Sequence, residues 1–396
     1  MLKFVPFVKG GIGALVLGAA ISVSGLSYAQ DEEAQDEEGT RLSDVSGWIK
    51  SNTGEKIKLG VGFRGSVRGI EDGSTDSNNW STNGSLDNMR LYVNASFTDH
   101  FAVEFNTEWE GTGSGVPSSS GDEDIRVLDG VLKYKKSDAF NIWLGRHLPP
   151  SDRSNLDGPY YLATYDYPGL VSRYPSIFAG RDDGISISGQ FEGGKLKYAV
   201  GAYKGSDNPD SNQLYAGRFT YNFLDPEPGY YTSSTYYGDK DIFAVALVLQ
   251  YQGDGVAVPL AGTEDFLGYN VDVLFEKGLS NDGVITVEGA AYRYDLNDAP
   301  GDGDAYMGLV GYLFPKKVGP GKFQPHVRYQ EFEDDKQYDA GVNYVIDGHN
   351  ARLSLVFSVI DPEFADYYNQ VVLGAQFRPP RVRVVDVEFR QYGKQS

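Results

Sequence analysis

Apolar and polar residues alternate along most of the chain in segments of about ten residues. In Asn88–Phe97, for example, every second residue from Met89 onwards is apolar. The residues between them, from Arg90 onwards, are mostly polar. Because successive side chains of a β-strand point to opposite faces, this pattern predicts strands with one apolar and one polar face. The segments with this pattern are Lys56–Arg68, Asn88–Phe97, Phe101–Glu110, Ile125–Lys136, Phe140–Arg146, Gly184–Glu192, Leu196–Lys204, Leu214–Phe223, Ile242–Gln252, Phe266–Lys277, Val284–Tyr294, Ala305–Phe314, Lys322–Phe332, Gln337–Ile346, Ala351–Ile360 and Gln370–Phe377.

The start of the chain has the features of a secretory signal peptide over residues 1–29. Two lysines precede an apolar stretch, Ile12–Leu26, and Ser27-Tyr28-Ala29 fits a small-x-small cleavage site. A transmembrane anchor is the alternative, but the apolar stretch is short for a membrane span. Residues 30–54 begin with many Asp and Glu residues and are expected to be an acidic periplasmic leader.

An exported chain with these strands is expected to form a transmembrane β-barrel over residues 55–377. After the signal peptide, the longest apolar run is Phe243–Leu249, which is far too short for a membrane helix. Backbone polar groups inside a bilayer must be paired, so such a chain can enter a membrane only as a closed barrel. We therefore predict an all-β, antiparallel barrel of about 16 strands.

The connections between the predicted strands differ in length. Turns such as Glu192–Lys195 and Asp347–Asn350 are short, whereas Glu71–Ser85, Gly111–Asp124 and Leu224–Asp241 are longer and polar. In outer-membrane barrels, short turns lie on the periplasmic side and longer loops on the extracellular side. Aromatic residues near the strand ends are expected to form interfacial girdles; they are Trp143, Tyr221, Phe223, Tyr251, Tyr312, Phe314, Tyr344 and Phe377.

One connection, His147–Asp183, is unusually long and aromatic. Long segments without secondary structure are usually functional or disordered, and the many rings favour burial over disorder. We expect this loop to fold into the barrel lumen as a constriction; the alternative is an extracellular loop packed on its neighbours. Its charged candidates are Arg153, Asp166, Arg173, Arg181 and Asp182.

The polar faces of the strands are expected to line the pore. The predicted pore-lining residues are Lys58, Arg64, Arg68, Arg90, Glu104, Glu108, Asp129, Lys133, Arg218, Arg328 and Arg352, with Glu192, Lys197, Asp272, Glu288 and Asp339 as further candidates. Rings of one charge sign set ion selectivity, whereas these charges are mixed. Mixed charges predict weak selectivity unless the signs segregate by height in the pore.

Composition excludes several classes of function. The chain has no Cys, which rules out disulfides, thiolate metal sites and covalently attached c-type haem. Its four His residues show no metal-ligand spacing, so neither a metal nor a cofactor is expected. The net charge of −20 argues against binding to nucleic acid.

Four stretches resemble the phosphate-selective porin O and P family. They are Gly341–Leu355, Leu144–Arg146 followed by a Pro pair, Gly180–Gly184 and Gly311–Phe314. The resemblance extends from about Lys56 to Phe377. It implies a 16-stranded, trimeric outer-membrane porin in which rows of arginine and lysine select phosphate. The abundant lumen carboxylates argue against phosphate selectivity.

The end of the chain allows two interpretations. Phe377 fits the aromatic residue that ends many barrels, which makes residues 378–396 a C-terminal extension. However, Val382–Tyr392 also alternates and could be the closing strand instead. We expect the extension.

The expected function is that of a non-enzymatic outer-membrane porin of a Gram-negative-type bacterium, in contact with membrane lipid and passing small ions and hydrophilic solutes. One alternative is a sheath around an electron-transfer partner. A second is a barrel enzyme, for which the only sequence signal is His147 near Ser151 and Asp152. A third, a soluble lectin-like β-protein, is disfavoured by the many apolar faces.

Overall fold

The computed structural model describes the residues of the barrel and of its inner loops. The described ranges are 57–71, 79–110, 124–173, 180–206, 211–227, 229–258, 262–379 and 382–383. The predicted signal peptide and acidic leader, and most of the predicted C-terminal extension, lie outside the described residues. Within the described ranges, no helix is long and apolar enough to span a membrane.

Strands account for most of the described chain, with one short α-helix and one turn of 3-10 helix. The elements are β1 (Ile57–Glu71), β2 (Trp80–Ser96), β3 (Phe101–Glu110), β4 (Asp124–Ser137), β5 (Phe140–His147), α2 (Arg153–Asp157), β6 (Asp182–Phe191), η1 (Glu192–Gly194), β7 (Leu196–Tyr203), β8 (Leu214–Asn222), β9 (Ile242–Val258), β10 (Gly262–Gly278), β11 (Val284–Asp295), β12 (Gly303–Leu313), β13 (Lys322–Phe332), β14 (Asp335–Asp347), β15 (Ala351–Asp361), β16 (Tyr368–Phe377) and β17 (Val382–Arg383).

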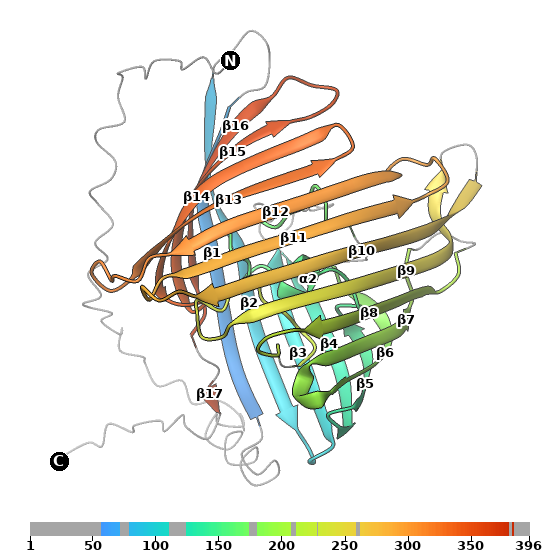
Figure 1. Ribbon diagram of the computed structural model, residues 1–396. Helices are drawn as coiled ribbons and strands as arrows, with labels where there is room; N and C mark the ends of the chain where they lie inside the picture. The colour runs from blue at the N-terminus through green and yellow to red at the C-terminus, as the bar shows by residue number, and fades with distance from the viewer. Residues whose placement is uncertain are drawn as a thin grey trace, which may run out of the picture. The chain divides into compact units, whose positions relative to one another are not determined.

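The strands β1–β16 form one closed antiparallel barrel (Figure 1). Each strand pairs with the next one in the chain, and β16 pairs with β1 in a register that sets Phe377 opposite Phe63. The short strand β17 extends this seam, because Val382 lies opposite Leu59. The predicted all-β barrel of 16 strands is therefore confirmed, with β16 and the first residues after it both paired to β1.

The barrel is polar inside and apolar outside. On β15, Arg352 and Ser354 are buried in the lumen, whereas Leu353, Leu355 and Phe357 are about half-exposed on the outer surface. The same alternation recurs on strands around the barrel. Such a surface is costly in water but suits lipid tails. The fold is that of a transmembrane β-barrel, not of a soluble sandwich.

Two expectations about local structure are wrong. Both ends of Glu71–Ser85 are strand and not loop, because Glu71 pairs with Trp80 and β2 continues from Trp80 through Ser85. Trp143 belongs to no outer girdle, since its ring stacks on that of Tyr230 at 4.5 Å. Alternation alone could not assign Trp143 to a face of the barrel. Strand β5 is short, and all its residues except Leu144 and the last one are partly buried.

The two ends of the barrel can be distinguished by their connections. Connections that follow even-numbered strands, such as residues 97–100 and 348–350, share one end, which we call the short-turn end. The segment Leu224–Asp241 follows β8 and therefore belongs to this end. Its grouping with the extracellular loops is therefore wrong. The grouping rested on the length of the segment, and length alone does not determine at which end a connection lies.

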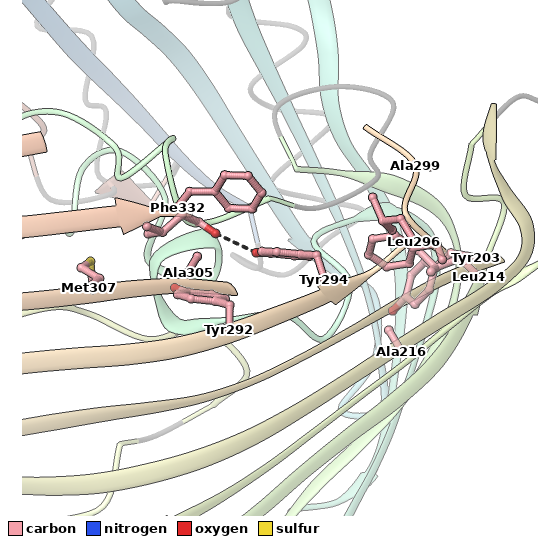
Figure 2. Close-up of a cluster of buried hydrophobic side chains, with 12 residues drawn as sticks. Tyr203, Leu214, Ala216, Tyr292, Tyr294, Leu296, Ala299, Ala305, Met307 and Phe332 are labelled. Atoms are coloured by element: carbon pink, nitrogen blue, oxygen red, sulfur yellow. Dashed lines mark hydrogen bonds between the residues drawn. The ribbon is translucent and has the colours of Figure 1, made fainter. Parts of the chain in front are cut away.

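The largest cluster of buried apolar side chains lies inside the barrel. It joins Val171, from the loop between β5 and β6, to residues of β7, β8 and β10–β13 and of the β11–β12 connection. Figure 2 shows Tyr292 and Tyr294 on one strand beneath Phe332. The Tyr294 hydroxyl donates a hydrogen bond to the Val171 carbonyl at 2.7 Å. This cluster fixes the far part of the loop within the lumen.

Candidate functional site: the barrel lumen

The described first part of the loop between β5 and β6, residues 148–173, lies inside the barrel, as predicted. Side chains of the inner wall donate hydrogen bonds to its backbone carbonyls. These bonds run from Arg352 to Leu162 (2.6 Å), from Asn343 to Ala163 (2.7 Å), from Arg328 to Asp166 (2.7 Å) and from Gln376 to Tyr160 (2.9 Å). Because four strands, β13–β16, hold consecutive parts of the loop, its path across the lumen is fixed. We call residues 148–173 the constriction segment.

The wall makes room for the rings of this segment with glycines. A Cβ atom on Gly374 would lie 2.2 Å from the Tyr165 ring, and one on Gly62 would lie 2.7 Å from the Tyr160 ring. The Tyr165 hydroxyl also donates to Asp87 at 2.6 Å, and the guanidinium of Arg64 lies 4.2 Å from the centre of its ring. Rings packed directly on the wall backbone narrow the lumen on the side of β16, β1 and β2.

A second segment also enters the lumen, from the short-turn end. The β8–β9 connection, residues 223–241, contacts the constriction segment through a two-pronged ion pair between Arg153 and Glu227, with N–O distances of 2.7 and 2.6 Å. Ser234 adds a hydrogen bond to Asp157 at 2.6 Å. We call residues 223–241 the inner turn segment. Sequence reasoning missed its role, although its four tyrosines were the same signal that placed the constriction segment inside.

Burial shapes the protonation of the carboxyl groups between the two segments. Burial alone raises the pKa of Glu227, but attraction and hydrogen bonds from Arg153 outweigh it and hold that pKa at about 2. Burial raises the pKa of Asp152 to about 6, because its main hydrogen-bond donors are neutral hydroxyl groups. Glu227 is therefore ionised across the physiological range, and its charge belongs to the contact between the segments.

Most of the predicted pore-lining charges are paired with opposite charges across the inner wall. The pairs are Arg90 with Glu108, Lys133 with Glu104, Arg218 with Asp272 (2.8 Å), Arg328 with Asp339 (2.7 Å), Arg181 with Asp129 (3.2 Å) and Arg68 with Asp166 (2.8 Å). Lys58 shares the inner face of β1 with Arg64 but is exposed at the short-turn end. Most of the mixed charges in the sequence thus become pairs in the structure, whereas Arg64 and Arg352 bind uncharged oxygen atoms.

Two predicted constriction residues have uncharged partners. The guanidinium of Arg173 lies 3.5 Å from the centre of the Phe332 ring and donates to the Leu170 carbonyl at 3.2 Å. Asp182 accepts a hydrogen bond from the backbone of Gly205 at 2.8 Å. Asp182 is thus bound to the neighbouring β7–β8 connection, at the edge of the lumen.

The two segments fill much of the lumen. Arg64, Arg90, Glu108, Arg218, Arg328 and Arg352 are all buried, although lining a wide water-filled pore would leave them exposed. Two cavities remain beside the wall of β2–β8, with volumes of about 330 and 370 Å³. The space that an enclosed electron-transfer partner would need is thus occupied by the chain itself.

The described residues offer no arrangement for metal binding and no catalytic triad at His147. No group of three His, Asp or Glu side chains among them could hold a metal ion. His147 contacts Ser186 at 2.5 Å, while Asp152 accepts a hydrogen bond from Tyr292 at 3.0 Å. Ser151 accepts one from Asn155 at 2.8 Å. The three residues that are close in sequence are therefore directed to different partners.

Comparison with known proteins shows the fold. Neither a protein-family model nor a curated protein sequence matches the chain. Among solved structures, OprB of Pseudomonas putida is similar with a TM-score of 0.60 and 10% identity, over 88% of this chain and 100% of that one. A loop-deletion mutant of OmpT, an outer membrane protein of Vibrio cholerae, is similar with a TM-score of 0.52 and 14% identity, over 82% of this chain and 99% of that one.

These likenesses and the apolar outer surface define the class: the chain has the fold of an outer-membrane β-barrel. The narrower resemblance to the phosphate-selective porin family stays a prediction.

Proposed function

We propose that this protein is an outer-membrane porin that lets small ions and hydrophilic solutes diffuse passively through a narrow lumen. The observation that carries the proposal is the constriction segment, held across the lumen by hydrogen bonds from β13–β16. Barrels of 16 strands enclose an aqueous channel, so a loop fixed across the lumen in this way narrows that channel. The two lumen cavities mark the space left for solutes.

The proposed pore is weakly selective. Selectivity needs uncompensated charge of one sign near the narrowest point. Here the cations Arg90, Arg218 and Arg328 each face a carboxylate partner, so their charge is neutralised locally. A strong preference for phosphate, which the sequence resemblance implies, would need rows of cations without such partners. We therefore propose at most a modest preference for anions.

A homotrimer is part of the same proposal. It is supported by the sequence resemblance and by the trimer form of OmpT from Vibrio cholerae, which is similar to this chain with a TM-score of 0.50 and 14% identity, over 82% of this chain and 99% of that one. Chemical cross-linking of the detergent-solubilised protein tests it: trimeric bands are expected, and bands of monomer alone contradict it.

Conductance across a planar lipid bilayer tests the proposed function. The folded, purified protein is expected to give discrete, voltage-independent steps at low voltage, of smaller amplitude than an unobstructed barrel of this size would give. Heat-denatured protein from the same preparation is the control for contaminating channels. A barrel that inserts, as shown by its strand signal in circular dichroism, but gives no steps would contradict the proposed pore.

A further inference from the structure

A cavity of about 330 Å³ lies between the wall strands β5–β8 and the two inner segments. Its walls include Trp143, Ser188, Lys197, Thr220 and Tyr230. On one side it is lined by Lys135 and Asp138, whose side chains are 59% and 68% exposed at the short-turn end. A solute can therefore reach this cavity from the short-turn end of the barrel.

Lys197 is unusual among the inward-facing cations. Its side chain lines the cavity, the residue is only 8% exposed, and it makes no hydrogen bond or ion pair with any described residue. Its neighbour Arg218 is bound to Asp272, and the nearby carboxylate of Glu227 is already bound to Arg153 and Tyr236. An ammonium group that has left bulk water without a partner is costly. The cavity therefore holds one positive charge that is only partly compensated, by the Glu227 carboxylate that Arg153 also binds.

Neutral hydrogen-bonding groups surround this charge. The hydroxyl groups of Ser188 and Thr220 and the side-chain amide of Gln190 line the same cavity. Within the part of the chain that the structure describes, none of these three side-chain groups has a hydrogen-bond partner. These groups face the open space of the cavity, where a polar solute can take the place of water as their hydrogen-bond partner.

From this arrangement we infer that the cavity is a binding site for a small hydroxylated monocarboxylate. The carboxylate would accept hydrogen bonds from Lys197, and the hydroxyl groups of the solute would pair with Ser188, Thr220 and Gln190. A single cation matches a monoanion, whereas a dianion would bring an unpaired negative charge into a space of reduced dielectric. The inference names a class of solute that the protein would bind near the short-turn end. The physiological role of this site rests on the proposed diffusion function.

Isothermal titration calorimetry of the detergent-solubilised protein tests the site with sodium lactate as the probe. Lactamide has nearly the same shape without the charge, and sodium sulfate supplies a dianion. Saturable binding of lactate is expected. Lactamide should bind at least about tenfold more weakly because it loses a charged hydrogen bond, and sulfate should do so because one of its charges is left unpaired. Lactate binding no tighter than lactamide binding would overturn the inference.

Substitutions locate the site. Lys197→Gln is expected to weaken lactate binding at least about tenfold. Lys195→Gln removes an exposed lysine two residues away and is expected to bind lactate as the original protein does. Thr220→Val keeps the shape and all charges, and serves as a second variant if Lys197→Gln fails to fold; it is expected to weaken binding several-fold. Equal affinities in the original protein and in Lys197→Gln would refute the site.

Conductance separates this inference from the proposed function. If lactate binds as expected but the bilayer shows no steps, the proposed pore fails while the binding site stands. If steps occur but lactate does not bind, the pore stands and the site fails.

Discussion

The ion pair between Arg153 and Glu227 joins the two segments that enter the lumen from opposite ends. Both side chains are almost fully buried, at 1% and 0% exposure. Glu227→Gln keeps the size of the side chain but removes its charge, and it leaves Arg153 buried beside fewer negative groups. We expect this change to loosen the inner turn segment from the constriction segment and to widen the lumen.

The size of the effect follows from the protonation of Glu227. A pKa of about 2 in place of 4.5 corresponds to about 3 kcal/mol of stabilisation by the ionised form. Breaking a buried ion pair by removing one partner costs about 3–5 kcal/mol, which agrees with this value. Because the pKa is lowered in the folded state, the stabilisation is complete above pH 4.5 and is lost as the pH falls towards 2.

Two measurements check this prediction. Thermal unfolding in detergent is expected at a lower temperature for Glu227→Gln, and single-channel conductance is expected to rise. Glu192→Gln, at an exposed residue of the same end, is the matched control and should change neither quantity. Unchanged conductance together with an unchanged unfolding temperature would show that the pair does not hold the segments in the lumen.

Three further predictions follow from the lumen and the outer surface. Lowering the pH from 5 to about 2 should raise the conductance of the original protein reversibly but leave Glu227→Gln unchanged, since the ion pair between the segments needs the ionised Glu227 carboxylate; equal responses would contradict this. Replacing both Arg173 and Arg181 with Ala should shift the reversal potential in a salt gradient towards cations, because Asp129 loses its partner; an unchanged or opposite shift would place these charges outside the ion path. Leu355→Lys places a charge on the lipid-facing side of β15 and should cost about 2–4 kcal/mol of stability in a bilayer, as measured by urea unfolding; a cost near zero would mean that this position lies outside the apolar belt.

The sequence predicted the barrel because alternation is a local signal. Segments such as Lys322–Phe332 and Ala351–Ile360 were expected with nearly the bounds of β13 and β15. The aromatic content of residues 147–183 also predicted an inward loop, since many rings need a surface to cover. Leu224–Asp241 also holds four tyrosines, but its length suggested a loop at the opposite end of the barrel.

For strands with clear alternation, such as β13 and β15, the sequence alone determined which side chains face inwards, and it also determined that the chain forms a membrane barrel, because both follow from a period of two along each strand. Only the tertiary structure decided which inward charges compensate one another. Arg218 and Asp272 lie far apart in the chain and meet because β8 and β10 place them near each other, while Lys197, one strand away from Arg218, is left without a partner among the described residues. Pairing depends on register and on the path of the two inner segments, and long-range contacts of this kind leave no periodic trace in the sequence.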